Sequence, residues 1–159
     1  MPLSPSTVAN FFLEAGHREN VPVTPLMLQK LVYFAHGWYV GFTGEPLIDQ
    51  PVEAWKYGPV VPSLYHEFKD FGNSPITRLS SSSAILPELA RDVLAAKPLL
   101  ERVWKTYSKY TASQLSALSH HPNGPWARAA LMQNGPVPNR VIPESLIRDY
   151  FEARANKTD

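Results

Sequence analysis

The segment from Leu26 to Val40 constrains the fold more than any other part of the sequence, because it is apolar on nearly every side. A helix with apolar residues all round belongs in the centre of a domain, whereas a surface helix keeps one polar face. Thr24 and Pro25 stand directly before it, and they suit the N-cap and first position of a helix. We therefore expect a central helix that begins at Pro25. Its exceptions to the apolar pattern are Gln29, Lys30 and His36.

Helical periodicity recurs along the rest of the chain. We expect the first helix to stop at Gly16, and Pro98 to kink or divide the stretch from 87 to 107. Thr111 and Gln114 match a capping box, which starts a helix at that point. Besides the central one, the expected helices span about 5–15, 62–71, 87–107, 112–119, 125–132 and 143–151.

Residues 41 to 58 break the helical pattern with several glycines and prolines. Short apolar pieces between these breakers predict a small β-hairpin or short sheet around residues 46–57, ended by a turn at Gly58 and Pro59. Residues 72–87, rich in serine, predict a long loop, with an edge strand at 75–79 as the alternative.

Length and composition fit one domain. The chain has 159 residues, of which 44% are hydrophobic and 18% charged, and such a chain can bury a sizeable core. The expected fold class is mainly α: a single compact helical domain over residues 1–159, with about six or seven helices and one small β element.

Several classes of protein are disfavoured by what the sequence lacks. The absence of cysteine removes disulfides, thiolate nucleophiles and cysteine-ligated zinc. No apolar run reaches the roughly 18 to 20 residues of a membrane span. The N-terminus also lacks the basic region of a signal peptide. We therefore expect a cytoplasmic protein with no membrane partner.

No short catalytic or nucleotide-binding motif occurs. The sequence has no H-E-x-x-H helix, no G-x-S-x-G elbow, no Walker A loop and no G-x-G-x-x-G fingerprint. We expect no catalytic residue, no metal and no cofactor. The alternative is a small metal-dependent or hydrolytic enzyme, whose residues would have to converge on one pocket: Lys30, His36, Glu53 and His120.

The charge distribution gives little support for nucleic-acid binding. The net charge is +1, and residues 81–159 carry ten Lys and Arg against seven Asp and Glu. So small an excess would have to be gathered in one continuous basic patch. Its members would be Arg91, Arg102, Lys105, Lys109 and Arg128. We rank this interpretation below the enzymatic one.

Two tracts stand out from a generic core. In the central helix, Lys30 either extends its amine to solvent, with His36 bonded to a backbone carbonyl, or serves a binding role. In the second tract, from Glu53 to Pro62, the aromatic residues Trp55 and Tyr57 resemble the anchors of a binding surface. The alternative is that Trp55 fills the core while Glu53 pairs with Lys56 or Lys30.

Together with Leu118-Ser119-His120 and Pro125-Trp126, these tracts resemble the Panacea domain, the family of SocA-like antitoxins and GepA-like phage-associated proteins. The likeness extends over roughly residues 5 to 130. A local departure is the extra segment 121–124 before Pro125. The residues that carry the signature, and that we regard as candidates for partner binding, are Gln29, Lys30, Tyr33, His36, Glu53, Trp55, Tyr57, Gly58, Pro59, His120 and Trp126.

The resemblance implies an antitoxin that binds and neutralises a protein toxin from a neighbouring gene. In one branch of the family it also implies an adaptor that delivers the toxin to a protease. No enzymatic residue is implied. The toxin's identity, the contact surface and the oligomeric state, including a homodimer, stay open, as do the roles of the 72–87 loop and the 130–159 tail.

Overall fold

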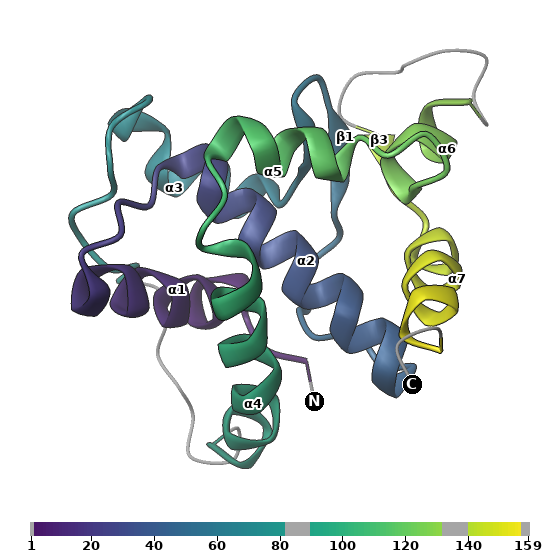
Figure 1. Ribbon diagram of the computed structural model, residues 1–159, viewed down its shortest axis with the longest axis horizontal. Helices are drawn as coiled ribbons and strands as arrows, with labels where there is room; N and C mark the ends of the chain where they lie inside the picture. Colours follow the sequence, from purple (N-terminus) through teal and green to yellow (C-terminus); the bar gives the residue numbers. More distant parts are fainter. Residues whose placement is uncertain (1, 82–89, 132–139, 157–159) are drawn as a thin grey trace.

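The predicted central helix is present as α2 (Pro25–Thr43) in the computed structural model, which describes residues 2–81, 90–131 and 140–156. The hydroxyl of Thr24 accepts a hydrogen bond from the amide of Met27, as expected of an N-cap. The helix ends at Gly44, whose positive φ of 77° suits glycine. Twelve of its residues are buried, and it runs diagonally through the molecule (Figure 1).

Five helices pack directly on α2, so its apolar circumference is covered from several sides. The sixth, α6 (Pro125–Leu131), packs on the last helix and on the sheet. A short 3₁₀ helix spans Lys69–Phe71. The five helices around α2 are α1 (Pro5–Glu19), α3 (Pro62–Phe68), α4 (Ala90–Tyr107), α5 (Ala112–Ser119) and α7 (Glu144–Ala155).

The predicted end of the first helix is wrong. Helix α1 continues past Gly16 to Glu19 and ends at Asn20, which adopts the left-handed conformation with φ of 58°. Gly16 is instead a point of close approach, because a Cβ there would lie 2.8 Å from the carbonyl oxygen of Val21. Of the two outcomes predicted at Pro98, a division of the helix is wrong, because helix α4 continues through that residue. The capping box of Thr111 and Gln114 is confirmed.

The β element lies later in the sequence than predicted. Strands β1 (Glu53–Trp55) and β2 (Gly58–Val60) form a hairpin, so Gly58 and Pro59 belong to a strand and not to a turn. A third strand, β3 (Arg140–Val141), pairs antiparallel with β1 and was not predicted. The sheet order is β2-β1-β3. Two residues are too few for a periodic signal, which explains why β3 escapes sequence analysis.

The predicted loop at 72–87 is described only as far as residue 81, and its remainder lies outside the described residues. No strand forms at 75–79. The predicted tail region likewise falls partly outside them, since 132–139 and 157–159 are not described.

Helix α7 packs closely against α2 because two glycines remove side chains from the contact. A Cβ on Gly37 would lie 2.3 Å from the ring of Phe151, and one on Gly41 would lie 2.8 Å from that residue's backbone carbonyl. The Phe151 ring is also held edge-on by Tyr33 and Trp38, with centroids 5.8 and 5.1 Å away. Phe151 therefore fills a space that only glycine at position 37 leaves open.

The predicted fold class is confirmed: the described residues form a mainly α, single compact domain with seven α-helices and one small three-stranded sheet. Within the same residues, none of the helices combines the length and the apolar character needed to cross a membrane.

Candidate functional site

Two signature residues of the central helix, Gln29 and Lys30, hold the β1–β2 hairpin by its backbone. The side-chain amide of Gln29 donates to the carbonyl oxygen of Val61 at 3.1 Å and accepts from the Val61 amide at 2.8 Å. One residue along the helix, the Lys30 amine donates to the carbonyl oxygen of Pro59 at 3.0 Å. All three bonds reach strand β2 or the residue after it, so α2 fixes one edge of the hairpin.

Residues of α5 and α6 hold the other side of the hairpin in the same way. The Ser116 hydroxyl donates to the carbonyl oxygen of Tyr57 at 2.9 Å, and the Trp126 indole donates to that of Trp55 at 2.7 Å. His120 has Nε2 3.4 Å from the carbonyl oxygen of Lys56, and its ring lies edge-on to Trp126 with centroids 4.1 Å apart. We call this set of groups the hairpin clamp: Gln29, Lys30, Ser116, His120 and Trp126.

Lys30 is the most unusual member of the hairpin clamp, because its side chain is fully buried. Burial lowers the pKa of its amine to about 7, since the charged form loses its hydration. No carboxylate in the described part of the chain forms an ion pair with it. The expectation that Lys30 extends its amine to solvent is therefore wrong.

Gly58 lets the clamp close around the hairpin. Its φ is 112°, a conformation that side chains rarely adopt. A Cβ there would lie 2.7 Å from the Ser119 hydroxyl oxygen and 2.9 Å from the Lys30 nitrogen. The structure thus brings Lys30, Ser119 and His120 together around this one glycine.

Gly58→Ala is expected to lower the free energy of unfolding by about 2 kcal/mol, because strain at positive φ and a close contact with buried polar groups add together. The measurement is urea denaturation followed by circular dichroism. Gly44→Ala is the matched control, since Gly44 also has positive φ but has open space around it. Equal losses in the two variants would contradict the role given to the contact.

The two aromatic residues of the second tract lie differently. Tyr57, at the tip of the hairpin, is 63% exposed. Trp55 is half-buried and lies edge-on to Tyr65, with centroids 4.8 Å apart, instead of filling the core. Its indole donates to the carboxylate of Glu53 at 2.9 Å, so the predicted pairing of Glu53 with a lysine is wrong.

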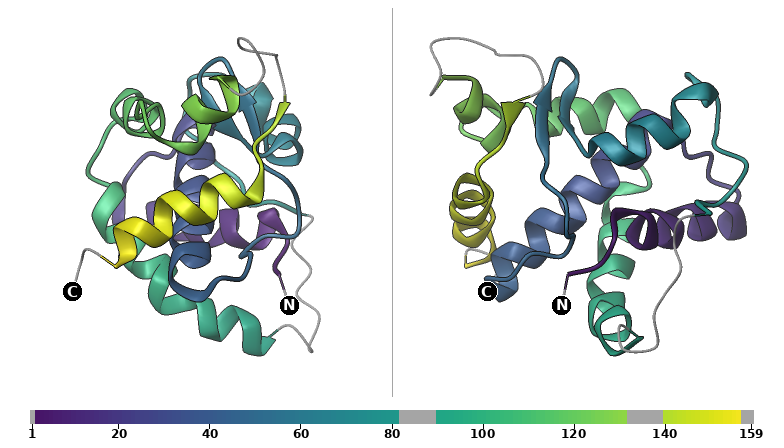
Figure 2. Two further views of the ribbon diagram at one scale, coloured as in Figure 1. Left: turned by 90° about the vertical axis from the view of Figure 1, so that its right-hand side faces the viewer. Right: turned by 180° about the vertical axis from the view of Figure 1, so that it is seen from behind.

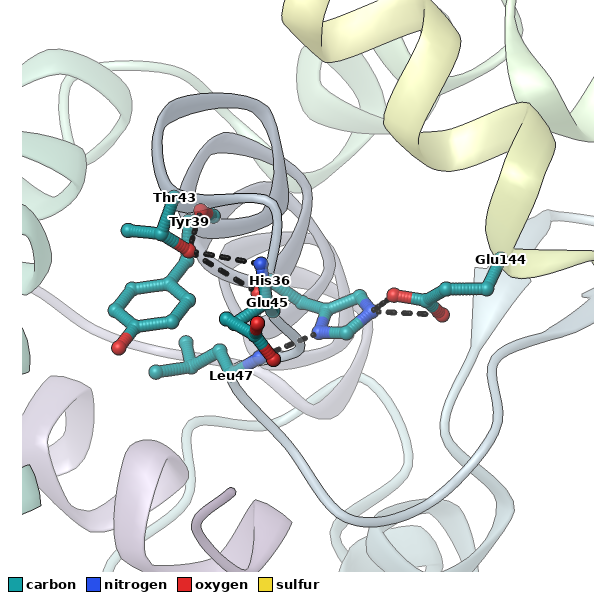
Figure 3. A network of polar contacts seen from close by, with 6 residues as sticks. All are labelled: His36, Tyr39, Thr43, Glu45, Leu47 and Glu144. Atoms are coloured by element: carbon teal, nitrogen blue, oxygen red, sulfur yellow. Dashed lines mark hydrogen bonds and ion pairs between the residues drawn. The ribbon is translucent and has the colours of Figure 1, made fainter. Parts of the chain in front are cut away.

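His36 lies away from the hairpin and joins α2 to the last helix (Figure 3). Its Nδ1 accepts a hydrogen bond from the amide of Leu47 at 3.3 Å, which leaves the proton on Nε2. Nε2 lies 3.0 Å from a carboxylate oxygen of Glu144, the first residue of α7. The expected bond to a backbone carbonyl is therefore replaced by this pair.

Glu144 is placed favourably for a negative charge, at the positive end of the α7 helix dipole. Its partial burial raises the pKa of the carboxyl, but the hydrogen bond from His36 and the electrostatic interaction with His36 and Arg148 leave that pKa lowered overall. Tyr33, the remaining signature residue of α2, is buried in the core, where burial raises the pKa of its hydroxyl. These residues support the fold around the site and do not line it.

The four residues of the enzymatic alternative do not meet in one pocket. Lys30 and His120 contact the hairpin backbone, Glu53 contacts Trp55, and His36 contacts Glu144 and Leu47. Over the residues that the structure describes, no group of three or more His, Asp or Glu side chains is arranged to hold a metal ion. The basic residues of the nucleic-acid alternative stand mostly on or just after α4, with Arg128 on α6.

The sequence analysis did not identify three residues that contact the signature residues: Ser116, Tyr65 and Glu144. Ser116 could have been found, because Ser116, Ser119 and His120 share one face of a helix at i, i+3 and i+4. Tyr65 lies on the expected helix from 62 to 71, but no pattern marked it as a contact of Trp55, and it is 40% exposed. Glu144 carries no local signal, since its partner is 108 positions away.

Comparison with known proteins gives two matches. A family model described as "Antitoxin SocA-like, Panacea domain" matches residues 28–127, a span that includes the whole hairpin clamp. The chain is also similar to antitoxin SocA of Caulobacter vibrioides (strain NA1000 / CB15N), with 37% identity over 155 residues, covering 91% of this chain and 80% of that protein. No solved structure matches significantly.

Proposed function

Because this chain belongs to the Panacea family of SocA-like antitoxins, we propose that it neutralises a cognate protein toxin in the cytoplasm by binding it directly. The observation that supports this most is the rigidly held hairpin with an exposed aromatic tip. The arrangement suits binding more than catalysis, because four signature residues use their polar groups to hold this hairpin in place: Gln29, Lys30, His120 and Trp126.

The tip of the hairpin has the properties of an interface anchor. The Tyr57 ring is exposed, while its carbonyl oxygen is held by Ser116. The amine of Lys56 lies 5.5 Å from the ring centroid, so a cation accompanies the aromatic face. Tyrosine offers a large contact area with little loss of conformational entropy, and a backbone that is already ordered reduces the cost of binding further. We propose that Tyr57 inserts into the toxin.

The test is coexpression of this chain with the adjacent open reading frame, scored by colony formation. The wild-type chain is expected to restore growth, and Tyr57→Ser to bind the toxin at least about tenfold more weakly because one central aromatic anchor is lost. Leu94→Ser is the matched control, because Leu94 is 68% exposed on α4, at the opposite end of the molecule from the hairpin (Figure 1).

Two results would contradict these proposals at different levels. A neighbour that is harmless alone, or that stays toxic beside the wild-type chain, would contradict the antitoxin function. Full protection by Tyr57→Ser with unchanged affinity would leave the function and contradict only the hairpin as the contact surface.

We also propose that, after binding its toxin, the chain acts as an adaptor that delivers the toxin to a protease. If the chain delivers its toxin for degradation, the toxin's half-life in growing cells falls when the chain is present. An unchanged half-life together with restored growth would indicate neutralisation by binding alone. Sedimentation of the purified chain decides whether the active species is a homodimer.

A further inference from the structure

A second surface feature is a small apolar hollow between the C-terminal half of α2 and α4. Its volume is about 150 Å³, which suits one large apolar side chain. Phe42, one of its walls, is 49% exposed. The apolar and aromatic residues that line the hollow are Trp38, Phe42, Leu99, Val103 and Tyr107.

The walls of the hollow are held in place by their own contacts. The Trp38 indole donates to the hydroxyl of Tyr107 at 2.8 Å, and the Tyr107 ring stacks on Phe34 with centroids 4.4 Å apart. Trp38 also stacks on Phe42, at 5.9 Å. The hollow is therefore formed before any ligand arrives, which lowers the cost of filling it.

The polar side chains around the hollow carry no negative charge, and Arg102 adds a positive one. Arg102 and Thr106 line it beside Tyr107, and no acidic side chain does. Among the residues that the structure describes, no carboxylate forms an ion pair with Arg102. The helix that carries it, α4, has four basic residues and two acidic ones. A ligand that places a carboxylate beside the apolar group would therefore complement this surface.

We propose that the hollow docks a segment of a partner protein in which a large apolar side chain is accompanied, within about one helical turn, by an Asp or Glu that pairs with Arg102. A second copy of this chain fits less well, because apposing two copies of α4 would bring basic residues together. The surface is separate from the proposed toxin contact: both views of Figure 2 place the hairpin at the top and α4 in the lower half.

The test is selection of random 12-residue peptides displayed on phage against the purified full-length chain at low salt. Enriched peptides are expected to combine a large apolar residue with a nearby Asp or Glu. Thr106→Phe, which places a ring in the hollow at an exposed position, is expected to abolish their binding. Tyr57→Ser, on the other surface, is expected to leave the affinity unchanged.

Reversing the charges on Arg102 and on the peptide tests their pairing in a way that a folding defect of the variant cannot imitate. Arg102→Glu is expected to weaken a selected peptide by at least about tenfold. Replacing that peptide's acidic residue by lysine should restore binding to Arg102→Glu while weakening binding to the wild type. In the selection, the proposal is overturned if no peptides are enriched or if neutral or basic peptides dominate. In the variants, it is overturned if Thr106→Phe binds the selected peptides as well as the wild type does, or if the charge exchange does not change their affinity. A wild-type dimer that Thr106→Phe abolishes would also overturn it.

Discussion

Replacing Lys30 by methionine is expected to remove a rise of stability with pH that the wild-type chain shows between about pH 7 and 10.5. In the folded chain, burial lowers the pKa of the Lys30 amine from 10.5 to about 7. Between these values the unfolded chain holds a proton that the folded chain has released, so the free energy of unfolding increases with pH. The whole shift corresponds to about 5 kcal/mol, of which roughly 2 kcal/mol falls between pH 7 and 9.

The stability rises with pH because the folded and unfolded chains protonate the Lys30 amine differently. Below pH 7 the amine is charged in both, and the folded chain bears the full cost of a buried ammonium. Above pH 10.5 it is neutral in both, and that cost is gone. Other groups change the stability outside the interval of pH 7 to 9. The lowered pKa of Glu144 affects the free energy of unfolding in acid, and the raised pKa values of Tyr107 and Tyr150 affect it in strong alkali.

Urea denaturation at pH 7, 8 and 9 measures the effect. The wild type should gain stability at each step, whereas Lys30→Met should stay nearly level. The matched control is Lys97→Met, which removes an exposed lysine and should keep the wild-type slope. A slope that persists in Lys30→Met would show that another group releases the proton.

Gly37→Leu is expected to lower the free energy of unfolding by about 3 kcal/mol or more. Overpacking of a well-filled core costs roughly 1–3 kcal/mol, and here even the Cβ would lie 2.3 Å from the Phe151 ring. That ring cannot move aside freely, because Tyr33, Trp38 and Tyr150 surround it. The new side chain therefore has to displace α7 from α2.

A double-mutant cycle with Phe151→Ala gives a sharper measurement than the single variant. Phe151→Ala alone is expected to cost about 3–5 kcal/mol, because it leaves a cavity. In the double variant the leucine occupies that space, so the combined loss should be clearly smaller than the sum of the two. Additive losses would mean that Gly37 and Phe151 do not share the space as described.

The sequence predicted those parts of the fold that depend on local signals. Thr24 and Pro25 start α2, and Thr111 with Gln114 starts α5, because a cap acts within one helical turn. Gly16 gave a wrong helix end, since the same residue type serves both as a helix stop and as a point of close contact. The packing of Val21 and Val23 against Gly16 distinguishes the two roles.

The candidate site was predicted as a set of residues but not as an arrangement. Gln29, Lys30, His120 and Trp126 were chosen from a family likeness, which carries no information on which atoms they contact. Their partners are main-chain carbonyls and amides, and every residue offers those, so no pattern of side chains identifies them. The pairing of His36 with Glu144 was not predicted for another reason, because the two residues are far apart in the sequence.

The hairpin clamp has a consequence for how such a protein can change during evolution. Its members bind the carbonyl oxygens of Trp55, Lys56, Tyr57 and Pro59, and therefore depend on backbone atoms and not on side-chain identity. A mutation at the exposed position 57 alters what the tip presents while these bonds remain. The hairpin can thus diverge toward new partners with little loss of stability, much as a hypervariable loop does on a constant framework.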